Sequence, residues 1–395
     1  MQISVEKPGE VKLAVLPPLA LYVHIPWCAR KCPYCDFNSH ERSGELPEAE
    51  YIEKLFADLE HHLPSVWGRR LMSVFIGGGT PSLFSPGSID AILSGVRARL
   101  PLEPGSEITL EANPGTVEAA RFKGFREAGV NRISLGVQSF DDRMLQALGR
   151  IHDAAQARRA VEAALASFDN VNLDLMYGLP GQSAAMARAD LEQAIASGVP
   201  HVSAYQLTLE PNTAFWSKPP RLPEHDLCAD MQLAAEALLD AAGYEHYETS
   251  AFAKPGRRSR HNLNYWEFGD YLGIGAGAHG KLSFADRVTR HARIKQPRDY
   301  LAAENSIVED GAVPAPELPF EFALNALRLT DGFPPGLFTE RTGLPFSALE
   351  AGLQEAEKKG LLERDWQRIR PSARGRLFLN ELLERFLAGE SKDRG

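Results

Sequence analysis

The most constraining feature of the sequence is a sixfold alternation of short β-rich runs and longer amphipathic stretches between residues 21 and 245. The strand candidates are LYVHIP, SVFIGGGT, EITLEANP, RISLGVQS, NVNLDLMYG and HVSAYQLTLE. The segments between them carry apolar residues at helical spacing, over residues 49–63, 87–100, 117–128, 154–168 and 184–197. Because parallel strands need a long crossover connection, this alternation predicts a parallel sheet covered by helices.

Repeated βα units build either a doubly wound sheet or a barrel, and both place their sites at the carboxyl ends of the strands. Polar and glycine-rich residues stand at these ends, namely Gly77-Gly78-Gly79-Thr80, Glu111, Gln138 and Asp174. Six units rather than eight leave a barrel partly open, so that a large ligand can enter from the side. We therefore predict an α/β fold, a partial (β/α)6 TIM-like barrel with one polar mouth.

Beyond the repeats, the sequence predicts two further regions after a core over residues 15–245. Residues 246–315 are aromatic and glycine-rich, contain HNLNYW, and are interpreted as an irregular connecting sheet or cover. Residues 316–390 read as helices with a short strand pair near 361–369, the order of a winged-helix-like α-rich domain. Residues 317–395 hold 12 basic and 13 acidic residues, so we do not expect this domain to bind DNA.

Composition and charge narrow the cellular context. The chain carries 43 Lys and Arg against 52 Asp and Glu, a net charge of -9, which favours neither nucleic acid nor an anionic membrane. No apolar run approaches the roughly 20 residues of a membrane-spanning helix. The amino-terminal stretch lacks a basic segment followed by a long apolar one. We expect a cytoplasmic protein without a transmembrane segment, whose contact with membranes is at most transient.

Three of the four cysteines form one short motif, Cys28-x3-Cys32-x2-Cys35, directly after the first strand candidate. Thiolates at this spacing suit an iron–sulfur cluster, and three of them leave one metal vertex free for a small molecule. A structural zinc completed by Cys228 or a nearby histidine is the alternative that spacing alone leaves open. The cysteine motif therefore predicts a metal centre at the mouth of the barrel.

The motifs, taken together and in order, resemble one known family. They are LYVHIPWCARKCPYCDF, FIGGGTPS, LEANPGT, RISLGVQSF, LGRIH, LDLMYGLPGQ, YQLTLEPNT, RHNLNYW and YLGIGAGAHG, and they span residues 20 to 282. The chain is similar to the radical S-adenosylmethionine superfamily and, within it, to the family of oxygen-independent coproporphyrinogen III oxidase-like proteins, which includes a heme chaperone branch.

The resemblance implies two resident cofactors and their ligands. Cys28, Cys32 and Cys35 are expected to hold a [4Fe-4S] cluster whose fourth iron is chelated by S-adenosylmethionine, in one copy or two. The residues that match the family's S-adenosylmethionine-binding positions are Tyr22, Tyr34, Gly78, Gly79, Thr80, Glu111, Gln138, Arg150 and Asp174. No residue of the chain is assigned a catalytic role.

Two functions fit such a scaffold. One is a heme chaperone that binds heme and transfers it to acceptor proteins; the other is the oxygen-independent oxidase, which decarboxylates coproporphyrinogen III to protoporphyrinogen IX. The oxidases carry a fourth thiol where this chain has Phe37, and a longer arm before the cysteine motif than the 27 residues here. HNLNYW is the signature of the chaperone branch, which is therefore the function we predict.

The heme ligand is a separate question. His261 of HNLNYW is the candidate axial ligand, because a neutral imidazole binds heme iron. The same histidine could instead anchor its surroundings by hydrogen bonds. His24 and His279 are the alternative ligands.

Overall fold

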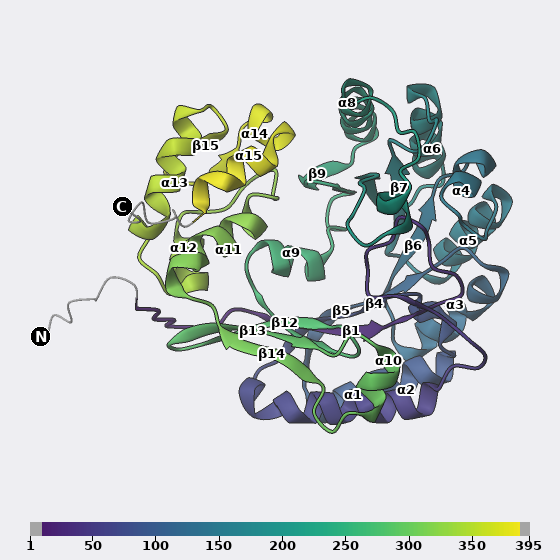
Figure 1. The fold of residues 1–395 in the computed structure, drawn as a ribbon, viewed down its shortest axis with the longest axis horizontal. Coiled ribbons are helices and arrows are strands. Elements are labelled where there is room, and N and C mark those ends of the chain that lie inside the picture. The colour runs from purple at the N-terminus through teal and green to yellow at the C-terminus, as the bar shows by residue number, and fades with distance from the viewer. Residues whose placement is uncertain (1–9, 388–395) are drawn as a thin grey trace, which may run out of the picture.

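The computed structural model describes residues 10–387, apart from the side chains of residues 116–119, and part of the amino-terminal stretch used above lies outside it. All six predicted strands form and stand next to one another in chain order, each parallel to the next (Figure 1). They are β1 (Leu19–Ile25), β4 (Leu71–Gly78), β5 (Leu102–Ala112), β6 (Arg132–Gln138), β7 (Val171–Tyr177) and β8 (His201–Gln206).

The helices that follow each of these strands pack on the outer face of the sheet, where they close the main hydrophobic core (Figure 1). They are α1 (Glu48–His62), α2 (Pro86–Arg99), α3 (Thr116–Ala128), α5 (Ala154–Ser167), α6 (Ala184–Ala196) and α8 (His225–Ala241). Local sequence sets their ends: Ser85 and Asp153 cap α2 and α5, and Gly129 ends α3 in the left-handed region. The short helices α4 (Asp142–Ala147) and α7 (Ala214–Ser217) lie in loops.

The region after the core continues the same sheet instead of forming an irregular cover. Strand β11 (Asp270–Ile274) pairs in parallel with β1, and β12 (His279–Phe284), β13 (Arg287–Arg293) and β14 (Ile307–Ala312) follow in antiparallel order. At the opposite edge, β10 (Ala251–Ala253) and β9 (Glu245–Glu248) complete twelve strands. The HNLNYW motif forms helix α9 (Arg260–Trp266), which contacts β4, β1 and β11 inside the curve of the sheet (Figure 1).

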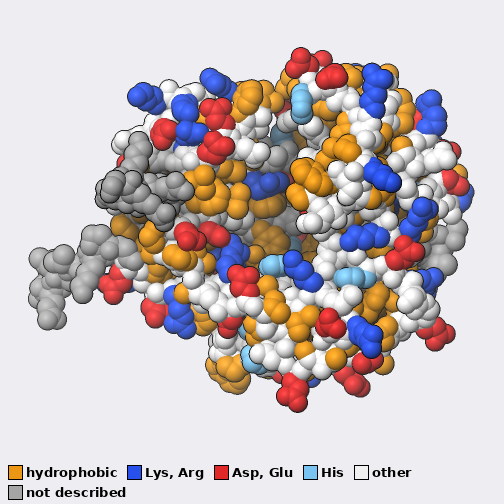
Figure 2. All heavy atoms as spheres, in the orientation of Figure 1, with side chains coloured by type: hydrophobic (Ala, Val, Ile, Leu, Met, Phe, Trp, Pro, Cys, Tyr) orange, Lys and Arg blue, Asp and Glu red, His pale blue; other side chains and the backbone are white. Residues whose placement is uncertain are grey.

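The carboxyl-terminal region has a hydrophobic core of its own and is mostly helical, with one short antiparallel strand pair. Figure 2 shows the surface hollowed between this domain and the barrel, with hydrophobic side chains on both sides. The remaining elements are α10 (Pro297–Ala302), α11 (Leu318–Ala326), α12 (Gly336–Thr342), α13 (Ser347–Lys358), the antiparallel pair β15 (Leu362–Arg364) and β16 (Ile369–Pro371), α14 (Ala373–Leu377) and α15 (Leu379–Leu383).

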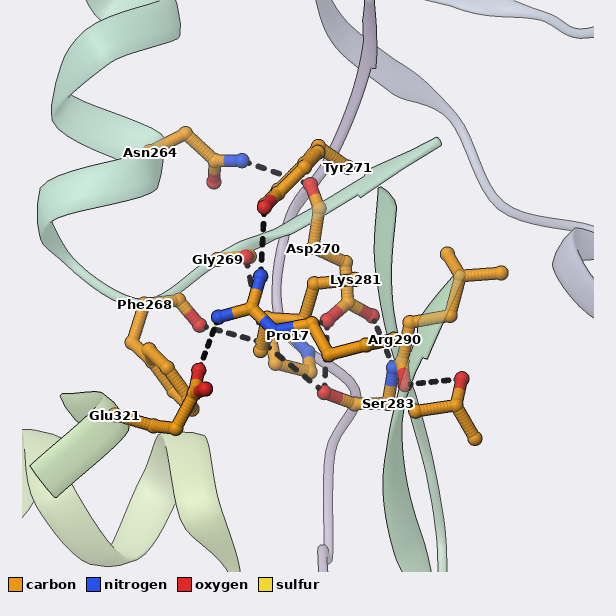
Figure 3. A network of polar contacts seen from close by, with 12 residues as sticks. Pro17, Asn264, Phe268, Gly269, Asp270, Tyr271, Lys281, Ser283, Arg290 and Glu321 are labelled. Carbon is orange, nitrogen blue, oxygen red and sulfur yellow. Dashed lines mark hydrogen bonds and ion pairs between the residues drawn. The ribbon is translucent and has the colours of Figure 1, made fainter. Parts of the chain in front are cut away.

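A buried polar network joins the extended sheet to this domain (Figure 3). The ammonium of Lys281 lies 3.0 Å from a carboxylate oxygen of Asp270, and it also donates to the carbonyl oxygen of Phe268 at 2.9 Å. Nearby, Arg290 donates to the hydroxyl of Tyr271 at 2.6 Å and forms an ion pair with Glu321 of α11. The ion pair therefore ties strand β13 to the first helix of the carboxyl-terminal domain.

No helix among the described residues is both long enough and apolar enough to cross a bilayer.

Candidate functional site

The cysteine loop follows β1 and is closed at its base by two short parallel strands, β2 (Trp27–Cys28) and β3 (His40–Glu41). Its position is fixed from a distant part of the chain. The amide nitrogen of Asn38 donates to the carbonyl oxygens of Ala276 and Lys295, at 2.9 and 2.8 Å. The loop is thus held against the turn between β11 and β12 and against the segment that follows β13 (Arg287–Arg293).

Each cysteine sulfur has a polar partner, two of them from distant segments and one from the loop itself. Thr80 Oγ1 donates to Cys28 Sγ at 3.5 Å, Arg150 Nη1 donates to Cys32 Sγ at 3.5 Å, and Ser39 Oγ lies 3.7 Å from Cys35 Sγ. Burial raises the pKa values of Cys28 and Cys35, which the hydrogen bonds from Thr80 and Ser39 partly offset. Donors at the sulfurs stabilise thiolates, the form that binds metal.

The glycine-rich end of β4 packs directly on the base of this loop. The amide of Thr80 donates to the carbonyl oxygen of Trp27 at 2.7 Å, and a Cβ at Gly79 would lie 2.6 Å from that oxygen. The amide of Gly78 donates to a carboxylate oxygen of Glu111 at 3.0 Å. Gly78 and Gly79 match S-adenosylmethionine-binding positions of the family, and at Gly79 the absence of a side chain also lets the chain pack closely on itself.

A pocket of about 150 Å³ opens over the three thiols. It gathers eleven of the residues predicted from the sequence: Cys28, Cys32, Cys35, Tyr34, Gly78, Gly79, Thr80, Glu111, Gln138, Arg150 and Asp174. Tyr22 lies instead in the neighbouring cavity, which shares Glu111 and Gly78 with this pocket. The strand ends therefore converge on one mouth, as expected for parallel βα units.

Two carboxyl groups, Glu111 and Asp174, line the pocket. Burial raises the pKa of Glu111 to about 8, and the nearby charge of Asp174 acts in the same direction. Asp174 accepts hydrogen bonds from Ser134 at 3.0 Å and Asn172 at 2.9 Å, although burial raises its pKa as well. Both groups can accept hydrogen bonds from a ligand's amine or hydroxyl groups.

Arg150 and Asn113 link the pocket wall to the cysteine loop. Arg150 Nη2 donates to Asn113 Oδ1 at 2.6 Å and to the carbonyl oxygen of Gly136 at 2.7 Å, while Asn113 Nδ2 donates to Thr80 Oγ1 at 2.8 Å. Sequence reasoning missed Asn113, although it stands inside the LEANPGT motif. Gln138 has a φ of 68°, a backbone conformation uncommon outside glycine and frequent at functional sites.

The candidate heme ligand His261 lies away from this pocket. It is 1% exposed, its Nδ1 shares a hydrogen bond with Ser73 at 2.8 Å, and its Nε2 shares one with Tyr265 at 2.9 Å. Burial lowers its pKa to about 3, and its ring stacks on Phe75. Since both ring nitrogens are engaged, the structure favours the anchoring role over ligation of an iron.

Cys228 does not complete a metal site with the loop. It is buried on α8 and faces Gly178, and it is not among the residues that line the pocket over the thiols. The alternative of a structural zinc site completed by Cys228 is therefore wrong.

The fold and the three-thiol loop define a radical S-adenosylmethionine protein. Residues 22–194 match the radical SAM superfamily, and residues 313–378 match the HemN C-terminal domain. Membership of this superfamily implies a [4Fe-4S] cluster and S-adenosylmethionine as cofactors.

Relatives narrow the class further. The chain is 50% identical over 381 residues to the heme chaperone HemW of Haemophilus influenzae, covering 95% of this chain and 99% of that protein. It is 51% identical over 378 residues to heme chaperone HemW of Escherichia coli, covering 94% and 99%. The chain belongs to the HemW family.

The solved structure of coproporphyrinogen III oxidase (HemN) from Escherichia coli superposes with a TM-score of 0.79. The match covers 94% of this chain and 90% of the oxidase, at 22% sequence identity. At this identity the likeness shows the shared fold alone.

Proposed function

We propose that this protein is a heme chaperone, which binds heme and transfers it to heme-receiving acceptor proteins. The observation that carries the proposal is the match, over almost their whole length, to relatives that bear this name. The oxidase alternative rests on a structural likeness at 22% identity. We further propose that the chain acts in the cytoplasm without a nucleic-acid partner, and that any membrane contact is transient.

The residues of the mouth fit the two cofactors that the superfamily implies. Three thiols, each with its own polar partner, face one pocket, so we propose that Cys28, Cys32 and Cys35 hold the cluster. The remaining predicted residues of the pocket, Tyr34 included, are proposed to bind S-adenosylmethionine, together with Tyr22 in the neighbouring cavity. When bound, these groups supply one-electron chemistry, while the protein supplies orientation and exclusion of water.

Individual contacts support this assignment. The buried Nε of Arg150 has no partner within the part of the chain that the structure describes, and it lies on the side chain that contacts Cys32. Glu111 and Asp174 offer acceptor oxygens, and burial keeps Glu111 protonated over much of the neutral range. A zwitterionic ligand can therefore bind in this pocket, since Glu111 in its protonated form adds no second negative charge beside Asp174.

Phe37 separates the two candidate functions chemically. It stands where the oxidases carry a fourth thiol, its side chain is 60% exposed, and it lines the pocket over the cysteines. A phenyl ring cannot ligate iron or exchange protons, but it can pack on a flat apolar ligand. The change favours binding over porphyrinogen chemistry.

The test is anaerobic reconstitution with iron and sulfide, followed by heme titration and coproporphyrinogen III turnover on the same sample. We expect about one heme per chain and no carbon dioxide release. A Cys32→Ala variant should fail to bind a full cluster, which checks the assignment of the thiols. Rapid decarboxylation, or failure of the reconstituted protein to bind heme, would contradict the proposal.

A further inference from the structure

A second cavity, with a volume of about 600 Å³, lies beside the pocket over the thiols. The two share Cys35, Phe37, Gly78 and Glu111 in their walls, so they lie side by side at the mouth of the barrel. Its volume falls within the range of small-molecule binding pockets, roughly 300–1,000 Å³. The pocket over the thiols is four times smaller.

The walls of this cavity are aromatic. Tyr265 and Tyr271 pack edge to face with their ring centroids 4.4 Å apart, and Phe37 lines another part of the wall. Phe37 is more than half exposed and stacks on no other described aromatic ring. An exposed phenyl ring and two half-buried tyrosine rings around a cavity suit a flat, largely apolar ligand.

The HNLNYW helix builds this wall. Tyr265 of this helix lines the cavity, and His261 lies behind it and shares hydrogen bonds with the hydroxyls of Tyr265 and of Ser73 on β4. Glu107 accepts hydrogen bonds from the amides of Arg260 and His261, both at 3.1 Å, which fixes the start of the helix. The motif therefore contributes to the cavity through its tyrosine, with the histidine as support.

A free imidazole and two ammonium groups also line the cavity. His279 is exposed, and its ring forms no hydrogen bond with the described residues, whereas both ring nitrogens of His24 are engaged by Tyr22 and the carbonyl oxygen of Asn38. Desolvation and the charge of Lys295 lower the pKa of His279, so the imidazole is neutral near pH 7.

The charges of the cavity complement carboxylates. Lys31 and Lys295 are exposed, and neither forms an ion pair within the described residues. The acidic residues that line it are Asp36, which is exposed, and Glu111, whose pKa of about 8 leaves it largely uncharged at pH 7. These groups match a single ligand that combines a flat apolar ring system, a metal ion that binds imidazole, and two carboxylates.

We propose that this cavity is the heme site, with the macrocycle against Phe37 and the tyrosine wall, His279 as axial ligand, and the propionates at Lys31 and Lys295. The inference rests on the proposed chaperone function and adds the location and the ligand. It replaces His261 as the residue that binds iron.

The experiment is an optical titration of the full chain with heme and, separately, with iron-free protoporphyrin IX. His279→Ala should lower heme affinity by about 10- to 100-fold and shift the Soret band, with protoporphyrin affinity unchanged. The double variant Lys31→Ala/Lys295→Ala should weaken both ligands. His61→Ala, the same change at an exposed histidine of α1, is the matched control and should alter neither titration.

The outcomes separate this inference from the function on which it rests. If the wild type binds heme but His279→Ala keeps the same spectrum and affinity, the site is wrong and the chaperone function stands. If His261→Ala, and not His279→Ala, changes the Soret band in folded protein, the ligand is wrong. If the wild type binds no heme, the proposed function fails and this inference with it.

Discussion

Replacing Gly79 by alanine tests whether the glycine-rich end of β4 is a packing surface for the cysteine loop. The added Cβ would lie 2.6 Å from the carbonyl oxygen of Trp27 and 2.9 Å from the carbonyl carbon of Pro26. These are backbone atoms, so no side-chain rotation relieves the contact. The amide of Gly79 donates to Ile25 at 2.8 Å, which holds the strand end in place.

The magnitude follows from this geometry. The contact with Trp27 is about 0.8 Å shorter than ordinary van der Waals contact, and relieving it separates the strand end from the loop. Overpacking of this kind costs about 1–3 kcal/mol, and losing a backbone hydrogen bond adds about 1 kcal/mol. We expect Gly79→Ala to lower the free energy of unfolding by about 2–4 kcal/mol and to reduce the iron retained after reconstitution.

Urea unfolding of the cluster-free protein measures the first effect, and iron content per chain measures the second. Gly87→Ala in α2 is the matched control, because its Cβ would meet nothing closer than 3.9 Å. Alanine there should leave iron content unchanged and stabilise the helix by about 0.5–1 kcal/mol. Wild-type stability and iron content in Gly79→Ala would refute the packing role.

Three further predictions concern buried polar groups. Lys281→Met removes the ammonium group that pairs with the buried carboxylate of Asp270 in the network of Figure 3, and should lower the free energy of unfolding in urea by about 3 kcal/mol. Its control, Lys123→Met at an exposed ion pair, should lower it by less than about 0.5 kcal/mol. The pKa of Glu111 is about 8 in the folded protein against 4.5 ordinarily, so its ionisation destabilises the fold as the pH rises through this interval. In pH-dependent urea unfolding, Glu111→Gln should therefore gain about 3–4 kcal/mol relative to the wild type between pH 5 and pH 8, and an unchanged difference would contradict the pKa shift. His261→Ala should lower stability by about 2–4 kcal/mol through lost packing and hydrogen bonds, and calorimetric unfolding checks this.

The strands and helices of the core were predictable because their signals are local. Apolar runs located every core strand, and apolar residues at helical spacing placed the starts of the five helices between them to within one residue. The mouth was predictable for a similar reason, since a parallel sheet brings the residues after each strand to one edge. The short α4 was missed, because six residues show too little periodicity.

The region after the core was not predictable in this way. Strand β11 reads as aromatic and glycine-rich sequence, and its place beside β1 depends on pairing between residues about 250 positions apart. Helix α9 begins where it does because Glu107, on β5, accepts its first amides. No local sequence pattern identifies Glu107 as the partner of this helix. The position of His261 behind Tyr265 could therefore not be predicted from the sequence.

The contact made by Asn38 has a consequence for the order of assembly. Its two acceptors, at Ala276 and Lys295, lie 238 and 257 residues later in the chain. During synthesis the three thiols are made early, but the two hydrogen bonds of Asn38 cannot form until strands β11, β12 and β13 have docked. In a nascent or truncated polypeptide the cysteine loop would not yet be held in place. We therefore expect the cluster to assemble after the whole sheet has folded.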